Sequence, residues 1–151
     1  MELNRFAIRY WVNGIEYWDN NYGYDYHDAA NRGVVGGSVS LGKAEYAGSG
    51  SAKHIEGIIY VSNDSFHKRV GIHYTSNGSS EWKDFDASYS HTDSIGTGVG
   101  GTQVETWKFS LPASVNSMEF VCYYKNLQTG VVSWDNNFYQ NYLLLPGRVL
   151  E

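Results

Sequence analysis

The stretch that decides the fold is EFVCYYKNLQTGVVSWDNNFYQNY, residues 119–142. Its first half alternates, so that Phe120, Cys122 and Tyr124 share one face of a strand. A turn signal at residues 128–130 follows, and a second short strand then leads into an aromatic, amide-rich loop. The stretch therefore predicts a β-hairpin with one buried face.

Nearly the same outline occurs at residues 5–26, RFAIRYWVNGIEYWDNNYGYDY. Its turn is Asn13-Gly14, the strongest short hairpin signal in a sequence. When the two copies are aligned, Trp18 and Trp134 lie 116 positions apart, the length of a whole domain rather than of a solenoid repeat. The repeat predicts two equivalent hairpins that belong to two different modules.

Three segments between the copies also alternate with a period of two: EGIIYVS at 56–62, RVGIHYT at 69–75 and ETWKFSL at 105–111. Turn clusters rich in Gly, Asn, Asp and Ser separate them. No segment keeps an apolar period of 3.6 residues over three turns. The sequence therefore predicts an all-β chain, and short strands with such turns favour a β-sandwich.

We expect four parts along the chain. Residues 1–28 would be the C-terminal hairpin fragment of a preceding tandem module, and residues 29–38 would be a linker. Residues 39–145 would form one complete module, and residues 146–151 a tail with a cloning scar. A fragment that does not dock would leave apolar surface exposed, so we expect self-association through the N-terminal hairpin.

The composition favours a neutral polar ligand. Aromatic residues make up 16% of the chain, charged residues only 18%, and the formal net charge is −5. Since nucleic-acid binding usually needs clustered Lys and Arg, we expect no nucleic-acid partner, and no apolar run of transmembrane length predicts a membrane partner. The single cysteine, Cys122, excludes an internal disulfide and is predicted to be a buried structural thiol.

Both copies place a tryptophan beside an acid and two amides. A pyranose ring has a face of C–H groups that packs on a flat indole, and its hydroxyls can bond to Asn or Asp side chains. Sugar recognition is therefore one interpretation. The other is an edge turn in which Asp and Asn bond their own backbone while the tryptophan caps the core. The residues alone leave both open.

The copies resemble family 21 carbohydrate-binding modules, which include the starch-binding domain of fungal glucoamylase and the glycogen-binding domain of protein phosphatase 1 targeting subunits. The resemblance extends through IEGIIYVSNDSFHKRVGIHYT (55–75), EWKDFDASY (81–89) and VETWKFSLP (104–112), and so covers nearly all of residues 39–145. It implies an immunoglobulin-like β-sandwich of about eight antiparallel strands. It also implies α-glucan (starch or glycogen) as the partner, with no catalytic residues. We expect no cofactor, and no metal site, because the five histidines show no paired metal-ligand spacing and the Asp and Asn clusters match no EF-hand or RTX calcium pattern.

By position, the resemblance assigns nine residues to carbohydrate binding. One site would comprise Asn63, Phe66, Lys68 and Tyr89, and a second would comprise Trp82, Trp134, Asp135, Asn136 and Asn141. The sequence departs from the family at Val121, where a third aromatic residue is expected. Either the second site is weaker here, or Tyr123 or Phe138 compensates.

In the N-terminal fragment, Trp18, Asn20 and Asp25 occupy the positions equivalent to those of the second site. A lone hairpin lacks the other wall of that site. The sequence therefore gives no reason to expect binding by the fragment.

Two other functions stay open. The chain could be a glycogen-targeting regulatory subunit of a protein phosphatase, although its nearest docking string, KRVGIH, has Ile72 where that class has Phe. It could also be a structural or adhesion domain without sugar binding, which exposure of Trp82 and Trp134 would argue against. We expect no enzyme, because loop carboxylates such as Asp84 and Asp86 are typical of solvated turns. The location would be extracellular beside an amylase and cytoplasmic in a glycogen-targeting protein.

Overall fold

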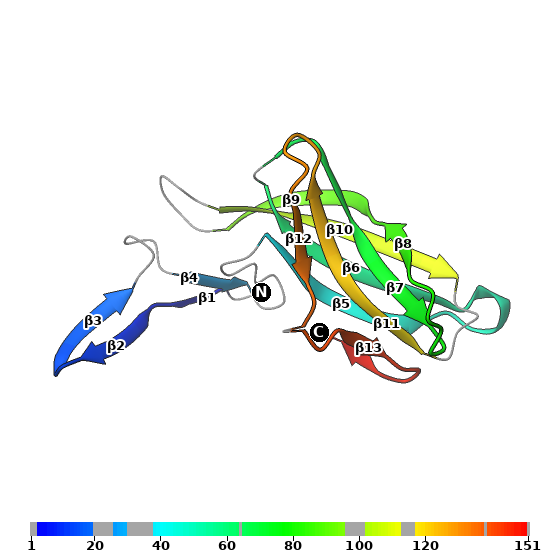
Figure 1. Ribbon diagram of the computed structural model, residues 1–151, viewed down its shortest axis with the longest axis horizontal. Helices are drawn as coiled ribbons and strands as arrows, with labels where there is room; N and C mark the ends of the chain where they lie inside the picture. Colours follow the sequence, from blue (N-terminus) through cyan, green and yellow to red (C-terminus); the bar gives the residue numbers. More distant parts are fainter. Residues whose placement is uncertain are drawn as a thin grey trace.

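The computed structural model describes residues 3–19, 26–29, 38–63, 65–95, 102–112, 117–137 and 139–150. Within these ranges the chain consists of β-strands and one short 3-10 helix, η1 (Gly50–Ala52). Two five-stranded antiparallel sheets form a sandwich, and an N-terminal hairpin extends to one side of it (Figure 1). The predicted all-β sandwich is confirmed. No helix in the described part of the chain is long and apolar enough to cross a membrane.

The first sheet has the strand order β14-β5-β6-β10-β9. Its strands are β5 (Val39–Ala47), β6 (His54–Ser62), β9 (Ser88–Ile95), β10 (Thr102–Pro112) and β14 (Val149–Leu150). β10 pairs with β6 on one side and with β9 on the other. The segment expected to be a tail supplies an edge strand, since Val149 and Leu150 pair with β5.

The second sheet has the order β12-β11-β7-β8, and β13 pairs with the beginning of β11. Its strands are β7 (Lys68–Ser76), β8 (Lys83–Asp86), β11 (Met118–Asn126), β12 (Val132–Asp135) and β13 (Tyr142–Leu144). All of β11 pairs with β7, whereas its other edge pairs first with β13 and then with β12. The loop between β12 and β13 therefore lies beside the middle of β11.

The core fills the space between the sheets with alternate side chains of each strand. Its largest fully buried side chains are those of Phe120, Ile55, Ile59, Ile72, Met118 and Leu144. Val70 and Ile72 are buried and Arg69 is exposed, as the period-two pattern predicts. Cys122 is fully buried, and this burial raises the pKa of its thiol well above the ordinary value, so the predicted structural thiol is confirmed.

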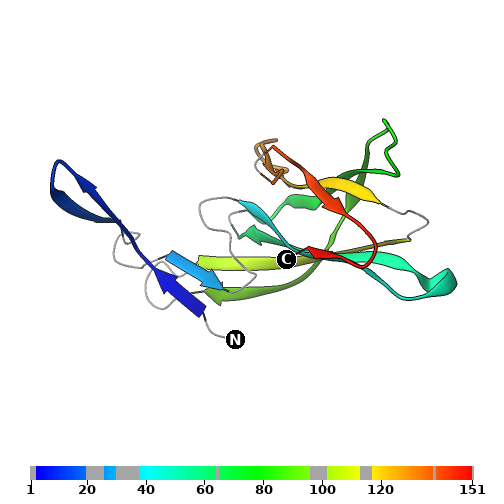
Figure 2. The same ribbon diagram turned by 90° about the horizontal axis from the view of Figure 1, so that it is seen from below.

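The N-terminal segment forms a hairpin of its own, in which β1 pairs with β4 and β2 pairs with β3. The bounds are β1 (Leu3–Phe6), β2 (Ile8–Val12), β3 (Ile15–Asp19) and β4 (Tyr26–Ala29). Asn13 and Gly14 have φ of 50° and 78°, as a type I′ turn requires, which confirms the predicted turn. Figure 2 shows from below that β2 and β3 extend away from the sandwich.

This hairpin repeats the pairing scheme of β11, β12 and β13. β1 and β2 together correspond to β11. β4 pairs with β1 and β3 pairs with β2, just as β13 pairs with the beginning of β11 and β12 with its later part. Arg9 lies opposite Trp18. At the matching position of the second copy, Tyr123 lies opposite Trp134. The sequence repeat is therefore also a repeat of strand register.

Candidate functional site

The outer face of the second sheet carries three neighbouring rings, those of Trp82, His73 and Trp134, here called the aromatic strip. The Trp82 indole stacks on the His73 imidazole, with ring centroids 5.2 Å apart and planes inclined by 18°. Trp134 meets the same imidazole edge-on, at 6.1 Å and 69°. Trp134 is 52% exposed and Trp82 is partly exposed. Neither indole is sealed inside the sandwich.

Strand register brings the three rings together. His73 on β7 lies opposite Asp84 on β8, and Trp82 directly precedes β8. Trp134 on β12 lies opposite Tyr123 on β11, which is itself paired with β7. The Asp84 carboxylate contacts Nδ1 of His73 at 2.6 Å. This contact fixes the imidazole on the outer face of the sheet.

Tyr123 is the cross-strand neighbour of Trp134. Tyr123 is 6% exposed, and its ring meets the indole edge-on at 6.1 Å. Its hydroxyl donates to Asp86, which also accepts a hydrogen bond of 2.8 Å from Arg69. Burial opposes ionisation of Asp86, but these two hydrogen bonds outweigh it, so the pKa of Asp86 is lowered. Burial and the bond to Asp86 raise the pKa of Tyr123.

Val121 occupies the position where the family resemblance leads us to expect a third aromatic residue. Val121 is 8% exposed and lies opposite His73 on the neighbouring strand. The valine supplies no ring, but the imidazole across from it contacts both indoles. Of the two residues considered as replacements, Tyr123 is buried beside Trp134 and Phe138 falls outside the described residues. His73 therefore supplies the ring between the tryptophans.

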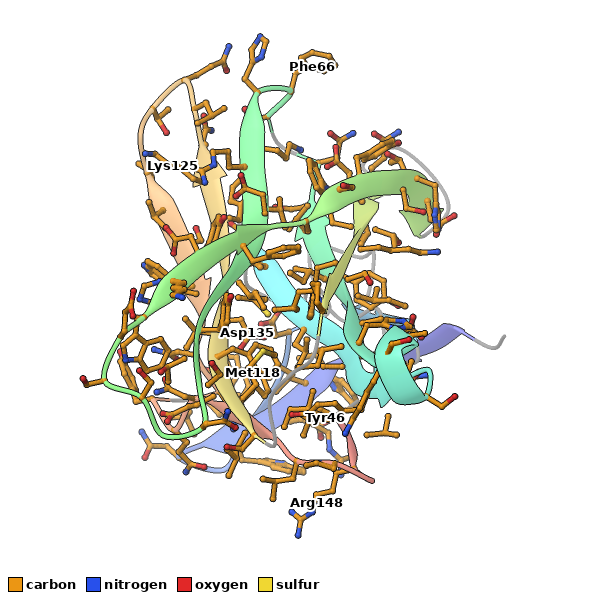
Figure 3. The ribbon with its side chains drawn as sticks, turned by 90° about the vertical axis from the view of Figure 1, so that its right-hand side faces the viewer. Tyr46, Phe66, Met118, Lys125, Asp135 and Arg148 are labelled. Atoms are coloured by element: carbon orange, nitrogen blue, oxygen red, sulfur yellow. The ribbon has the colours of Figure 1, made fainter. Side chains whose placement is uncertain are left out.

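Asp135 anchors the loop that follows β12. Its Oδ2 accepts hydrogen bonds from the Leu41 backbone N–H at 2.7 Å and from the Tyr142 hydroxyl at 2.8 Å. Its Oδ1 accepts a longer bond of 3.3 Å from the Asn137 backbone N–H. Burial and the bonds to Asp135 raise the pKa of Tyr142. The carboxylate thus ties β12 to β5 and β13, and Figure 3 places it among the side chains of the sandwich.

The amides of the same loop also bond to protein. Asn136 Oδ1 accepts from the Tyr139 backbone N–H at 3.1 Å, and Asn141 Nδ2 donates to Glu119 at 2.8 Å. Asn137, Tyr139 and Asn141 have φ of 51°, 68° and 58°, a left-handed conformation that asparagine tolerates better than most residues. The amide-rich phrase therefore shapes a tight loop, as the edge-turn interpretation proposed for Asp and Asn.

A second group of exposed side chains comes from the β6–β7 loop and β9. Phe66 is 90% exposed and points into solvent at one end of the molecule (Figure 3). Asn63 in the same loop donates from Nδ2 to Gln103 at 2.6 Å. Tyr89 on β9 is 53% exposed and packs edge-on against Trp107, with ring centroids 5.8 Å apart. These contacts hold polar and aromatic groups at the surface.

Lys68 belongs to the interior support of this group. Its side chain is only 2% exposed, and its Nζ lies 2.9 Å from Glu105 Oε1. The other oxygen of Glu105 accepts a hydrogen bond of 2.9 Å from the Trp107 indole N–H. The Lys68 ammonium also lies 5.8 Å from the centre of the Tyr124 ring. Lys68 thus links the start of β7 to β10.

Comparison with known families decides the relationship. Residues 36–145 match the family described as carbohydrate/starch-binding module (family 21). The chain belongs to this family. The family predicted from the sequence is confirmed, and with it the predicted non-catalytic carbohydrate-binding function.

Solved structures resemble this module as well. The carbohydrate-binding module of the muscle glycogen-targeting subunit of protein phosphatase 1 has a TM-score of 0.53 and 23% identity, over 76% of this chain and 78% of that chain. The starch-binding domain of Rhizopus oryzae glucoamylase, solved with β-cyclodextrin and maltoheptaose, is 27% identical over 73% of this chain and 95% of that chain, with a TM-score of 0.48. The first similarity supports the fold. A search of curated proteins found no match.

The structure divides the nine predicted residues of the module into two classes. The side chains of Asn63, Phe66, Trp82, Tyr89 and Trp134 are exposed or partly exposed. Lys68, Asp135 and Asn141 are hydrogen-bonded to other protein groups, and the Asn136 side-chain oxygen is bonded within its own loop. The exposed members are mostly rings, and the other four are polar residues that bond to neighbouring protein groups.

Sequence reasoning missed His73 and Glu105. The alternation of RVGIHYT correctly placed His73 on the outward face, but its contact with Trp82 depends on the pairing of β7 with β8. Glu105 is 8% exposed, and its position at the start of ETWKFSL gave no sign of its two partners. No group of three His, Cys, Asp or Glu side chains in the described ranges could hold a metal ion.

Proposed function

We propose that this module binds the α-1,4-linked glucose chains of starch and glycogen through the aromatic strip. The observation that carries the proposal is the half-exposed indole of Trp134, which makes edge-on contacts with the rings of Tyr123 and His73. The C–H face of a glucose ring packs on such a surface, and each stack contributes about 1 kcal/mol beyond area burial. Stacking needs no net charge, which agrees with an acidic chain that binds a neutral polymer.

Polar groups around the strip would bond to the glucose hydroxyls. Asp84 occupies Nδ1 of His73, so Nε2 is the imidazole atom that a sugar hydroxyl would meet. The Asn136 oxygen bonds to Tyr139, and its amide nitrogen remains a donor for the ligand. Asp135 and Asn141 act as positioning residues in this proposal, because their hydrogen bonds hold the loop beside Trp134.

A second contact with glucan would form at Asn63, Phe66 and Tyr89, supported by the ion pair of Lys68 with Glu105. The loop that carries Asn63 and Phe66 leads into the start of β7 at Lys68. This point lies about 16 Å along the strand from His73 of the aromatic strip, since a strand rises about 3.3 Å per residue. The two contacts are therefore separate. A long glucan that touches both gains affinity by multivalency, whereas each contact alone is weak.

The module would act by holding an attached catalytic or regulatory domain on the polymer, without chemistry of its own. A role as a phosphatase-docking subunit has less support. Val70 and Ile72, the apolar positions of the KRVGIH string, are buried in the core and leave no free docking peptide there. A purely adhesive sandwich would not require the exposed indole of Trp134.

Titration with maltoheptaose, followed by NMR of the backbone amides and indole N–H groups, tests the assignment. We expect shifts at Trp82, Trp134 and His73 and at Asn63 and Phe66 at millimolar ligand. Cellohexaose, a β-linked chain of similar composition, serves as the control and should cause much smaller shifts. A spectrum that maltoheptaose leaves unchanged would rule out the proposed function.

We also propose that residues 1–28 are the closing hairpin of a second module of the same fold, joined to the complete one by a linker at residues 29–38. The matching strand register supports this, since β2 and β3 stand in the places of β11 and β12. Residues 30–37 lie outside the described residues. In β11, the positions that match Ile8 and Tyr10 are the buried Cys122 and Tyr124.

That apolar face of the hairpin would associate with a second copy of this chain. Its members are exposed by 43% to 58%, namely Ile8, Tyr10, Val12, Ile15 and Tyr17. Sedimentation velocity over a hundredfold range of concentration should show a monomer–dimer equilibrium. Tyr10→Ser with Ile15→Ser should shift it to monomer, and a chain that is monomeric throughout would contradict the proposal.

A further inference from the structure

The opposite face of the N-terminal hairpin carries a different set of side chains. Alternation along β2 and β3 places Arg9 and Trp11 on one strand beside Glu16 and Trp18 on the other. Trp11 is 55% exposed and Trp18 is 58% exposed. We call the group formed by Arg9, Trp11 and Trp18 the hairpin strip.

The three side chains of the hairpin strip lie in contact. The Arg9 guanidinium carbon lies 4.5 Å from the centre of the Trp11 ring and 5.6 Å from the centre of the Trp18 ring. Trp18 lies directly opposite Arg9 on the other strand. Trp11 is on the same strand as Arg9 and is the diagonal neighbour of Trp18 across the strand pair. The guanidinium thus packs over both indoles on the paired strands β2 and β3.

Register shows which side of a sandwich this face corresponds to. Trp18 and Arg9 pair as Trp134 and Tyr123 do. The indole of Trp134 lies on the outer side of the second sheet, which carries the aromatic strip, away from the core. The hairpin strip therefore corresponds to the binding side and not to the side that a core would cover.

The hairpin differs from β11 and β12 in one respect that matters for binding. Trp11 occupies the position of Lys125, so the hairpin has two tryptophans on this face where the second copy has one. In the complete module, Trp82 comes from a loop of another strand pair. The hairpin supplies both rings from its own two strands, so the lack of a second wall does not remove the site.

We propose that the hairpin strip is a further α-glucan-binding site, in which Trp11 and Trp18 stack on glucose rings and Arg9 donates hydrogen bonds to their hydroxyls. The ligand class rests on the proposed function of the aromatic strip. Arg offers five N–H donors in a fixed geometry, and its guanidinium, packed over part of both half-exposed indoles, would bond to the hydroxyls of a sugar stacked on the ring surface left free. Simultaneous contact at both strips gives the chain a higher affinity for polymers than for short oligosaccharides.

The test uses the full chain with Trp82→Ala and Trp134→Ala, which removes the aromatic strip and leaves the hairpin intact. Three tryptophans then remain, Trp11, Trp18 and Trp107, and their indole N–H signals are assigned by single Trp→Phe changes. Maltoheptaose should shift the signals of Trp11 and Trp18 in a saturable manner and leave Trp107 unchanged. The proposal would be overturned if the Trp11 and Trp18 signals do not shift on addition of maltoheptaose, or if cellohexaose shifts them equally.

Retention on amylopectin in affinity electrophoresis supplies the second readout. Trp11→Ala with Trp18→Ala in the otherwise natural chain should weaken binding to amylopectin at least about tenfold through lost multivalency. The matched control is Lys108→Ala, an exposed side chain of β10 that lies outside both strips and outside the self-association face, and it should leave retention unchanged. If the Trp134 signal of the natural chain responds to maltoheptaose while Trp11 and Trp18 do not, only the hairpin site fails. If no indole responds, the proposed function fails as well.

Discussion

His73 is the residue on which the aromatic strip depends, because it touches both Trp82 and Trp134. His73→Ala would leave a gap between the indoles above Val121, and we expect maltoheptaose affinity to fall about threefold to tenfold. His54→Ala is a matched control, since His54 pairs with Glu56 on the other sheet. Fluorescence titration of the three proteins measures the effect. Equal affinities for all three proteins would show that His73 does not contribute to maltoheptaose binding.

Tyr123 and Asp86 should give the fold a specific response to acid. The lowered pKa of Asp86 contributes stability that is present above the ordinary aspartate pKa of about 3.9 and is lost as the pH falls through the folded-state value. Tyr123→Phe removes one hydrogen bond to the carboxylate. We therefore expect its unfolding free energy to decline less steeply than that of the natural protein below about pH 4.

Urea unfolding at steps between pH 6 and pH 2.5 measures this difference. Asp86→Asn cannot lose a charge in this range and is the control with the flattest profile. Parallel profiles for the natural protein and Tyr123→Phe would show that the hydrogen bond does not lower the pKa of Asp86.

Among the elements, the β12–β13 loop depends on a single carboxylate. Asp135→Ala leaves the Leu41 N–H and the Tyr142 hydroxyl without their partner, and we expect the free energy of unfolding to fall by about 2–4 kcal/mol. Glucan binding should fall too, because the loop no longer holds Trp134 in place. Glu81→Ala, an exposed acid next to Trp82, should change stability by no more than about 0.5 kcal/mol. Denaturant unfolding curves for the two variants test this contrast.

Individual elements were predictable to the extent that neighbouring residues decide them. Alternation identified the buried face of β7, β10 and β11, and the Asn13-Gly14 turn predicted the first hairpin. The pairing of Lys68 with Glu105 was not predictable, because it joins strands 37 positions apart in sequence. The same holds for His73, whose neighbours come from two other strands. A single sequence reports which face a side chain occupies, but not which residue lies beside it.

At the scale of the whole molecule, the repeated WDNN phrase combines the two interpretations left open by the sequence. Asp135 and Asn136 bond within the loop or to neighbouring strands, as an edge turn requires, whereas Trp134 stays exposed as a binding residue would. The amides and the acid shape the loop, and we propose that the indole contacts the glucan. The N-terminal copy presents its own tryptophan on the corresponding face.

We propose above all that Trp134 binds the ligand and does not stabilise the fold. The most direct test is to measure maltoheptaose affinity and urea unfolding on the same preparation of Trp134→Ala. We predict that affinity falls at least about tenfold while the unfolding midpoint stays within experimental error of the natural protein. Unchanged affinity, or a large loss of stability, would contradict the claim.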